Sequence, residues 1–217
     1  MTEQPSTLRR LPREVWAFGT VSLLTDTASH MVYPLLPKLL ETLGGGAVAL
    51  GVLEGTGELL ATVVKVWSGR ASDRSGARGP FVVFGYALAA LSRPALALVN
   101  APWQVVLARS LDRIGKGIRT APRDALMAAV TTDRNRGLAF GVQGAMDNLG
   151  AVFGPAVAWS LLAAHVSLRQ VFVLAVIPGL MSTAVAWLTV RREKERFRDP
   201  EPEPVSEPVT EPGPEAK

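Results

Sequence analysis

Hydrophobic residues in this chain gather in stretches that are long enough to cross a lipid bilayer. Five such stretches lie at 16–40, 47–67, 81–99, 138–164 and 171–190. About twenty apolar residues in a helix span the roughly 30 Å of hydrocarbon in a membrane. The pattern therefore predicts five transmembrane helices, and the segment 103–130 is a disputed sixth.

The disputed segment is charged on one side only. Its charged residues between positions 109 and 124 lie within roughly 140° of one helical face, and most apolar residues lie opposite. The seven are Arg109, Asp112, Arg113, Lys116, Arg119, Arg123 and Asp124. The segment is therefore either outside the membrane or the functional core of the protein.

Basic residues decide between these two interpretations, because Lys and Arg favour the cytoplasmic side of a membrane. With 103–130 as a sixth span, thirteen Lys and Arg residues fall on one side, in the N-terminus, in the expected loops at 70–78 and 134–136 and in the run 191–198. The other side has only Lys38, Arg169 and, at its edge, Arg93. We therefore expect an all-α protein with six transmembrane helices in the plasma (inner) membrane and both termini in the cytoplasm.

The two ends of the chain differ from the apolar region between them. Residues 1–14 predict a cytoplasmic N-terminus, and residues 15–198 predict the six-helix unit. Residues 199–217 alternate Pro and Glu with almost nothing to bury, which is typical of a disordered tail.

Composition excludes several classes of function. The chain has no Cys, which excludes disulfides, thiol catalysis and thiolate metal sites. Its net charge of +4 comes from loops and charged helices without the interleaved aromatic residues of nucleic-acid-binding proteins. His30 and His165 lie far apart, and no enzyme signature is present. We therefore expect no enzyme activity, cofactor or metal, and we expect a small-molecule substrate, protons and the lipid bilayer as partners.

The segment after the second span carries a recognisable pattern. Positions 69–78 read GRASDRSGAR, which resembles motif A of the major facilitator superfamily, G-x-L-a-D-r-x-G-r-k. Ala71 and Ala77 depart from it. The resemblance implies a cytoplasmic gate formed by Gly69, Asp73, Arg74, Gly76 and Arg78.

Two further patterns resemble motifs of the same family. Arg113, Gly117 and Ala121 fit motif B, with Lys116 in place of the usual Gln. Gly150, Gly154 and Pro155 fit the G-x-x-x-G-P kernel of motif C, which is common in antiporters of the family. Residues 133–139 resemble a further cytoplasmic loop of the family.

These resemblances imply the N-terminal six-helix half of a family transporter, in which two such halves enclose the substrate path. A parallel homodimer could recreate the twelve-helix arrangement, and a separately encoded second half is an alternative. A truncated half without transport activity, or a subunit that modulates another carrier, is a further alternative.

Charges inside the expected spans are the candidates for coupling chemistry, since an ionisable group at mid-membrane costs at least about 2.5 to 3.5 kcal/mol. Six basic and six acidic residues fall there, which favours ion pairing within the bundle. They are Lys65, Arg109, Arg113, Lys116, Arg119 and Arg123, against Asp26, Glu54, Glu58, Asp112, Asp124 and Asp147.

Among these, Asp26 is the predicted proton carrier and Arg113 its modulator, with Glu54 and Glu58 next. The remaining candidates for cavity charges are Arg109, Asp112, Lys116 and Asp147. A purely structural role for the acids stays open, and His30 is expected to be a simple hydrogen-bonding group. The predicted function is proton-coupled efflux of a small solute. An anionic substrate would suit the basic face if its charges are not all paired internally.

Overall fold

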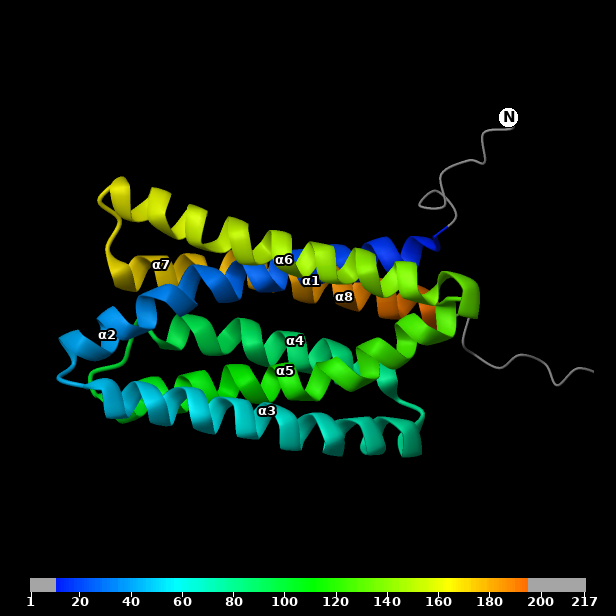
Figure 1. Ribbon diagram of the computed structural model, residues 1–217, viewed down its shortest axis with the longest axis horizontal. Coiled ribbons are helices and arrows are strands. Elements are labelled where there is room, and N and C mark those ends of the chain that lie inside the picture. The colour runs from blue at the N-terminus through cyan, green and yellow to red at the C-terminus, as the bar shows by residue number, and fades with distance from the viewer. Residues whose placement is uncertain (1–10, 195–217) are drawn as a thin grey trace, which may run out of the picture.

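The chain folds into six helical rods in a computed structural model that describes residues 11–194 (Figure 1). The predictions for the first ten residues and for the tail lie outside this part. The helices are α1 (Arg13–Val32), α2 (Leu36–Thr42), α3 (Ala47–Ser75), α4 (Arg78–Ala95), α5 (Pro102–Val130), α6 (Asp133–Ala163), α7 (Leu168–Leu174) and α8 (Val176–Lys194). A short 3-10 helix, η2 (Tyr33–Leu35), joins α1 to α2. The all-α expectation with six rods is confirmed.

Proline explains why two rods are each divided. Pro34 has no N–H to donate to the carbonyl of His30, and α1 gives way to η2 one residue before it. Pro178 likewise cannot donate to the carbonyl of Leu174, and α7 ends at that residue. The first and last rods therefore bend, whereas Pro122 and Pro155 lie inside the continuous helices α5 and α6.

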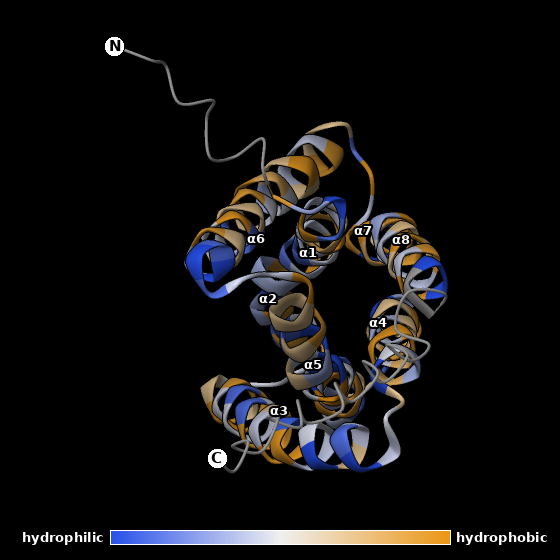
Figure 2. Ribbon diagram, turned by 90° about the vertical axis from the view of Figure 1, so that its right-hand side faces the viewer, coloured by the Kyte–Doolittle hydropathy of each residue, from blue (hydrophilic) through white to orange (hydrophobic). Residues whose placement is uncertain are grey.

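The rods form one curved row. α1 packs against α6 and α8, α4 packs against α8 and α5, and α3 packs against α5. Figure 2, which looks along the bundle, shows α6 and α3 at the two ends of this row and α8 and α4 at its middle. The polar helix α5 and the first helix α1 therefore face each other inside the curve.

Both ends of the described chain lie at the same end of the bundle as the α3–α4 and α5–α6 turns (Figure 1). Arg78, Arg134 and Arg136 belong to these turns or to the first turn of the helix that follows. Six rods therefore bring both ends of the described chain to the end of the bundle where these basic residues also lie.

Two helical segments of the described chain pass a test of length and apolar composition for membrane crossing: Ala47–Ser75 and Leu168–Arg192. α5 does not, because its charged residues leave no long apolar window. The six spans expected from the sequence are thus only partly matched by this measure. Large apolar side chains nevertheless cover the outside, including Trp67, Phe84, Leu91, Trp159 and Trp187, as expected for a surface in contact with lipid.

Two apolar clusters fill the interior. One gathers around Leu36, Leu40 and Phe172 toward the α2 end, and the other around Phe18 and Met127 toward the opposite end. Residues 22–30 of the first rod lie between the two clusters in sequence. Asp26, Ser29 and His30 in this stretch face the charged middle of α5, where the polar site is found.

Candidate functional site

A polar cavity of about 310 Å³ lies between the first rod and α5. Its walls are Asp26, Ser29, His30 and Tyr33 from the first rod, and Arg109, Asp112, Arg113, Lys116 and Arg119 from α5. Spacings of three and four residues place the α5 side chains on one helical face. The structure thus gathers Asp26 and four of the other predicted cavity charges, whereas Glu54, Glu58 and Asp147 are not among the lining residues.

At the α2 end of the cavity the charges are paired and buried. Asp112 forms ion pairs of 3.0 Å with Arg93 of α4 and with Arg109, and all three side chains are under 10% exposed. Arg93 also donates to the Ser29 hydroxyl at 2.8 Å, and the Arg109 guanidinium lies 5.1 Å from the centre of the Tyr33 ring. This network ties α1, α4 and α5 together.

Arg93 belongs to this network, which the sequence analysis did not predict. The sequence placed Arg93 at the edge of the side with few basic residues, and in the structure its side chain is 3% exposed and contacts the carboxylate of Asp112. An isolated arginine in an apolar stretch was the signal that could have pointed to a buried partner.

Arg113 pairs with Glu54 rather than with Asp26. The closest approach of the Arg113 guanidinium to the Glu54 carboxylate is 3.9 Å. A methyl group at Gly57 would lie 3.1 Å from Cγ of Arg113, so the missing side chain lets Arg113 extend along α3. Glu58 lies one turn further along α3 and is exposed.

Three charges nearer the other end of the cavity lack an ion pair within the described chain: Asp26, Lys116 and Arg119. Arg119 is 5% exposed and lies 4.5 Å from the centre of the Tyr86 ring. Its Nη1 atom is buried without a hydrogen-bond partner. Asp147 of α6 is close enough for its charge to act on Asp26.

Arg123 lies one turn beyond Arg119 on α5, outside the cavity lining, and the site prediction omitted it. Its guanidinium donates to the Ser22 hydroxyl at 3.2 Å and to the Asp124 carboxylate at 2.9 Å. The amide oxygen of Gln143, turned toward it, accepts at 2.6 Å. The residue therefore links α1, α5 and α6.

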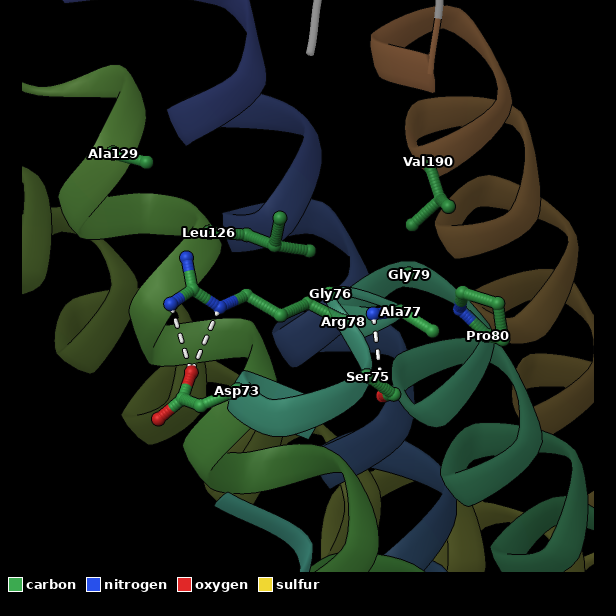
Figure 3. Close-up of a pocket in the computed structure, with 10 residues that line it drawn as sticks. All are labelled: Asp73, Ser75, Gly76, Ala77, Arg78, Gly79, Pro80, Leu126, Ala129 and Val190. Carbon is green, nitrogen blue, oxygen red and sulfur yellow. Dashed lines mark hydrogen bonds and ion pairs between the residues drawn. The ribbon is translucent and has the colours of Figure 1, made fainter. Parts of the chain in front are cut away.

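The region resembling motif A is mostly helical, which corrects the expectation of a loop over 70–78. α3 continues to Ser75, and the turn consists of Gly76 and Ala77. Gly76 adopts a left-handed conformation (φ 64°), which glycine tolerates best. Figure 3 shows Arg78 reaching Asp73, and the shortest distance between the two side chains is 2.8 Å. Both residues line a cavity of about 600 Å³. Arg74 is exposed beside this turn.

The positions resembling motif B bring α5 against α3. A methyl group at Gly117 would lie 2.7 Å from the carbonyl oxygen of Ala61, and one at Gly69 would lie 3.2 Å from Cβ of Ala121. The Ser68 hydroxyl also donates to the Gly117 carbonyl at 3.0 Å. Gly69 and Ala121, from two separate motifs, therefore share one helix contact.

The positions resembling motif C bring α6 against α1 beside the cavity. A methyl group at Gly150 would lie 2.7 Å from the carbonyl oxygen of Leu23, and one at Gly154 would lie 2.7 Å from that of Thr27. The same methyl groups would be within 2.9 Å of Cβ of Asp26 and of His30. Pro155 follows inside the same helix. This close contact between α6 and α1 therefore supports the part of α1 that carries two cavity residues, Asp26 and His30.

No group of three His, Asp or Glu side chains within residues 11–194 could hold a metal ion.

The sequence profile of the Major Facilitator Superfamily matches residues 18–214. The chain belongs to this family. The resemblance inferred from the motifs is confirmed, and with it membership of a family of multi-pass membrane transporters, which are not enzymes.

Relatives in the family include proteins of known and unknown role. An uncharacterized MFS-type transporter of Methanocaldococcus jannaschii is 34% identical over 175 residues, which are 80% of this chain and 44% of that protein. The multidrug resistance protein MdtH of Yersinia enterocolitica is 30% identical over 134 residues, 61% of this chain and 33% of that protein. The chain thus spans less than half the length of these relatives.

Solved structures share the fold at low identity. A crystal structure of a peptide transporter, POT, aligns with a TM-score of 0.69 and 18% identity over 85% of this chain and 38% of that one. The human organic anion transporter MFSD10 aligns with a TM-score of 0.65 and 21% identity over 86% of this chain and 48% of that one. Both likenesses concern the helix arrangement alone.

Proposed function

We propose that this chain forms the N-terminal six-helix half of a proton-coupled transporter that exports a small solute across the plasma (inner) membrane, with both termini in the cytoplasm. The observation that carries the proposal is the set of unpaired charges, Asp26, Lys116 and Arg119, in a cavity inside the curved row of helices. Free charges in a membrane are costly unless a ligand, a proton or water satisfies them.

Asp26 is the proposed proton carrier. Asp26 lies on α1 with His30 and faces the basic residues Lys116 and Arg119 of α5 across the cavity. A positive charge nearby favours a charged carboxylate and burial favours a neutral one, so a small movement of α5 relative to α1 can change whether the carboxylate holds a proton. Motif C supports this role, because Gly150 and Gly154 hold α6 against the part of α1 that carries Asp26.

Export is supported by two similarities. The kernel of motif C is typical of antiporters in the family, and several relatives are named multidrug resistance protein MdtH. A proton that enters as the solute leaves would drive such an exchange.

A second six-helix half is the proposed partner, either a second copy of this chain or a separate half. Six helices return the chain to its starting side, so a second copy can insert in the same orientation. Asp73 and Arg78 of motif A would then lie at the contact between halves. Cross-linking in native membranes should give a species of twice 23.1 kDa for the homodimer. A monomer without transport activity would instead support a modulatory or truncated half.

Transport in proteoliposomes tests the coupling. We expect solute accumulation to follow an imposed pH gradient in the wild type and to lose that dependence in Asp26→Asn. Glu41→Gln is the matched control, because Glu41 is an exposed acid paired with Lys38 outside the cavity. Unchanged gradient dependence in Asp26→Asn would overturn the proton assignment.

A further inference from the structure

We infer that the transported solute is zwitterionic, with its anionic group bound by Lys116 and Arg119 and its cationic group bound at Asp26. The inference rests on the proposed function, since it names the class of solute for the same cavity. It starts from the separation of the cavity charges into those that the protein satisfies itself and those that it leaves free.

Most of the basic residues on this face of α5 already have an acidic partner. Arg109 shares the carboxylate of Asp112 with Arg93, Arg113 pairs with Glu54, and Arg123 pairs with Asp124. An external anion would have to displace one of these carboxylates to bind there. Only Lys116 and Arg119 remain available among the cationic residues that line the cavity.

Arg119 is prepared for an anionic ligand. Its guanidinium is fixed against the Tyr86 ring at 4.5 Å, and its Nη1 atom is buried without a partner. A buried donor left unpaired costs free energy that an acceptor would recover. A guanidinium also matches the two oxygens of a carboxylate better than a point charge does.

Lys116 adds a second donor beside it. The two residues are three positions apart, so their side chains leave α5 on the same side. Lys116 is exposed, and its long side chain can move to meet a bound group. A fixed guanidinium and a movable ammonium can therefore bind the same carboxylate.

The cavity wall formed by α1, opposite α5, carries the complementary negative charge. Asp26 on α1 forms no ion pair with another described residue, and Asp147 on α6 adds negative charge nearby. A purely anionic solute would be repelled by these acids, and a purely cationic solute would be repelled by Lys116 and Arg119. A solute with both groups can place its anionic group at Lys116 and Arg119 and its cationic group at Asp26.

The same arrangement explains coupling to export. A cationic group at Asp26 favours the charged carboxylate, so its binding releases a proton, and proton binding in turn weakens the hold on that group. This reciprocal exclusion is what proton-driven antiport requires. The cavity volume of about 310 Å³ suits a small solute.

Binding of three probes of similar shape to the full chain in nanodiscs tests the inference. L-phenylalanine carries both charges, 3-phenylpropionate carries only the anion and phenethylamine carries only the cation. We expect L-phenylalanine to bind about tenfold more tightly than either singly charged probe. Equal affinity for L-phenylalanine and one of the other probes, or no binding of any of the three, would overturn the inference.

Variants separate the two ends of the site. Lys116→Gln should weaken the binding of L-phenylalanine and 3-phenylpropionate by about tenfold and leave phenethylamine unaffected, and Asp26→Asn should weaken the binding of L-phenylalanine and phenethylamine instead. Arg119→Lys keeps the charge of a buried residue and should weaken anion binding without unfolding the protein. Lys38→Gln, at an exposed lysine of α2 that pairs with Glu41 and does not line this cavity, is the control. Uniform loss of all probes in Lys116→Gln would overturn the assignment.

Binding and transport measurements can distinguish a failure of the zwitterion inference from a failure of the proposed coupling. Selective binding of L-phenylalanine without gradient-driven transport would support the zwitterion site and overturn the proposed coupling. Gradient-driven transport of a singly charged solute, with no preference for L-phenylalanine, would do the reverse.

Discussion

The two ends of the polar cavity contain similar residues in opposite states. Toward α2, Arg93, Asp112 and Arg109 are buried and pair with one another at 3.0 Å. Toward the other end, Lys116, Arg119 and Asp26 face each other and form no ion pairs in the described chain. The difference shows that the charged face of one helix serves two purposes: one part connects helices, and the other remains available to a ligand and a proton.

The largest expected effect comes from the paired end. Asp112→Ala would leave Arg93 and Arg109 buried without their shared carboxylate, and breaking a buried pair in this way costs about 3–5 kcal/mol. Thermal unfolding in detergent would measure the loss. The matched control is Asp73→Ala, which removes the carboxylate of an exposed pair. A loss no greater than that of the control would show that the network does not stabilise the bundle.

The next effect concerns the support behind the free end. Gly150→Ala would place a methyl group 2.7 Å from the carbonyl oxygen of Leu23, which must push α6 away from α1. Overpacking of this kind costs about 1–3 kcal/mol. Gly144→Ala, on the same helix with open space around it, should keep the unfolding temperature or raise it slightly, because Ala favours a helix more than Gly does. Equal stability of the two variants would contradict the close contact.

The sequence was sufficient for the general arrangement and for one face of α5. Apolar stretches and the distribution of basic residues predict six rods, and the spacing of charges predicts that Arg109, Asp112, Arg113 and Lys116 lie together. Glycine motifs indicate where helices approach closely. These features are local in sequence, or come from motifs with a fixed spacing.

Pairing between helices could not be predicted in the same way. Glu54 and Asp26 lie on different helices and were both plausible neighbours of Arg113, and the packing of α3 at Gly57 decides in favour of Glu54. Arg93 likewise finds Asp112 only because α4 and α5 lie side by side. Such contacts depend on helix rotation and depth, which a single sequence does not specify.

A smaller effect is expected at the exposed turn. Arg78→Ala removes the pair with Asp73, whose side chains are 38% and 59% exposed. Exposed pairs of this kind are worth about 0–1 kcal/mol. The change in unfolding free energy should therefore be well below that of Asp112→Ala, and it should shrink further at high salt. A loss of the same size as that of Asp112→Ala would mean that the turn has a structural role beyond this pair.

The smallest effect on stability is expected at Lys116. This variant tests most directly whether the unpaired end of the cavity differs in role from the paired end. Lys116 lies near the like charges of Arg113 and Arg119 and the opposite charges of Asp26 and Glu58, and it forms no ion pair in the described chain. Lys116→Gln should therefore change the unfolding free energy by no more than about 0.5 kcal/mol, because repulsion and attraction are removed together. Unfolding with and without a zwitterionic ligand would measure both properties at once. A ligand that stabilises the wild type but not Lys116→Gln would assign this end of the cavity to binding, whereas a large loss in the ligand-free variant would place Lys116 with the structural network around Asp112.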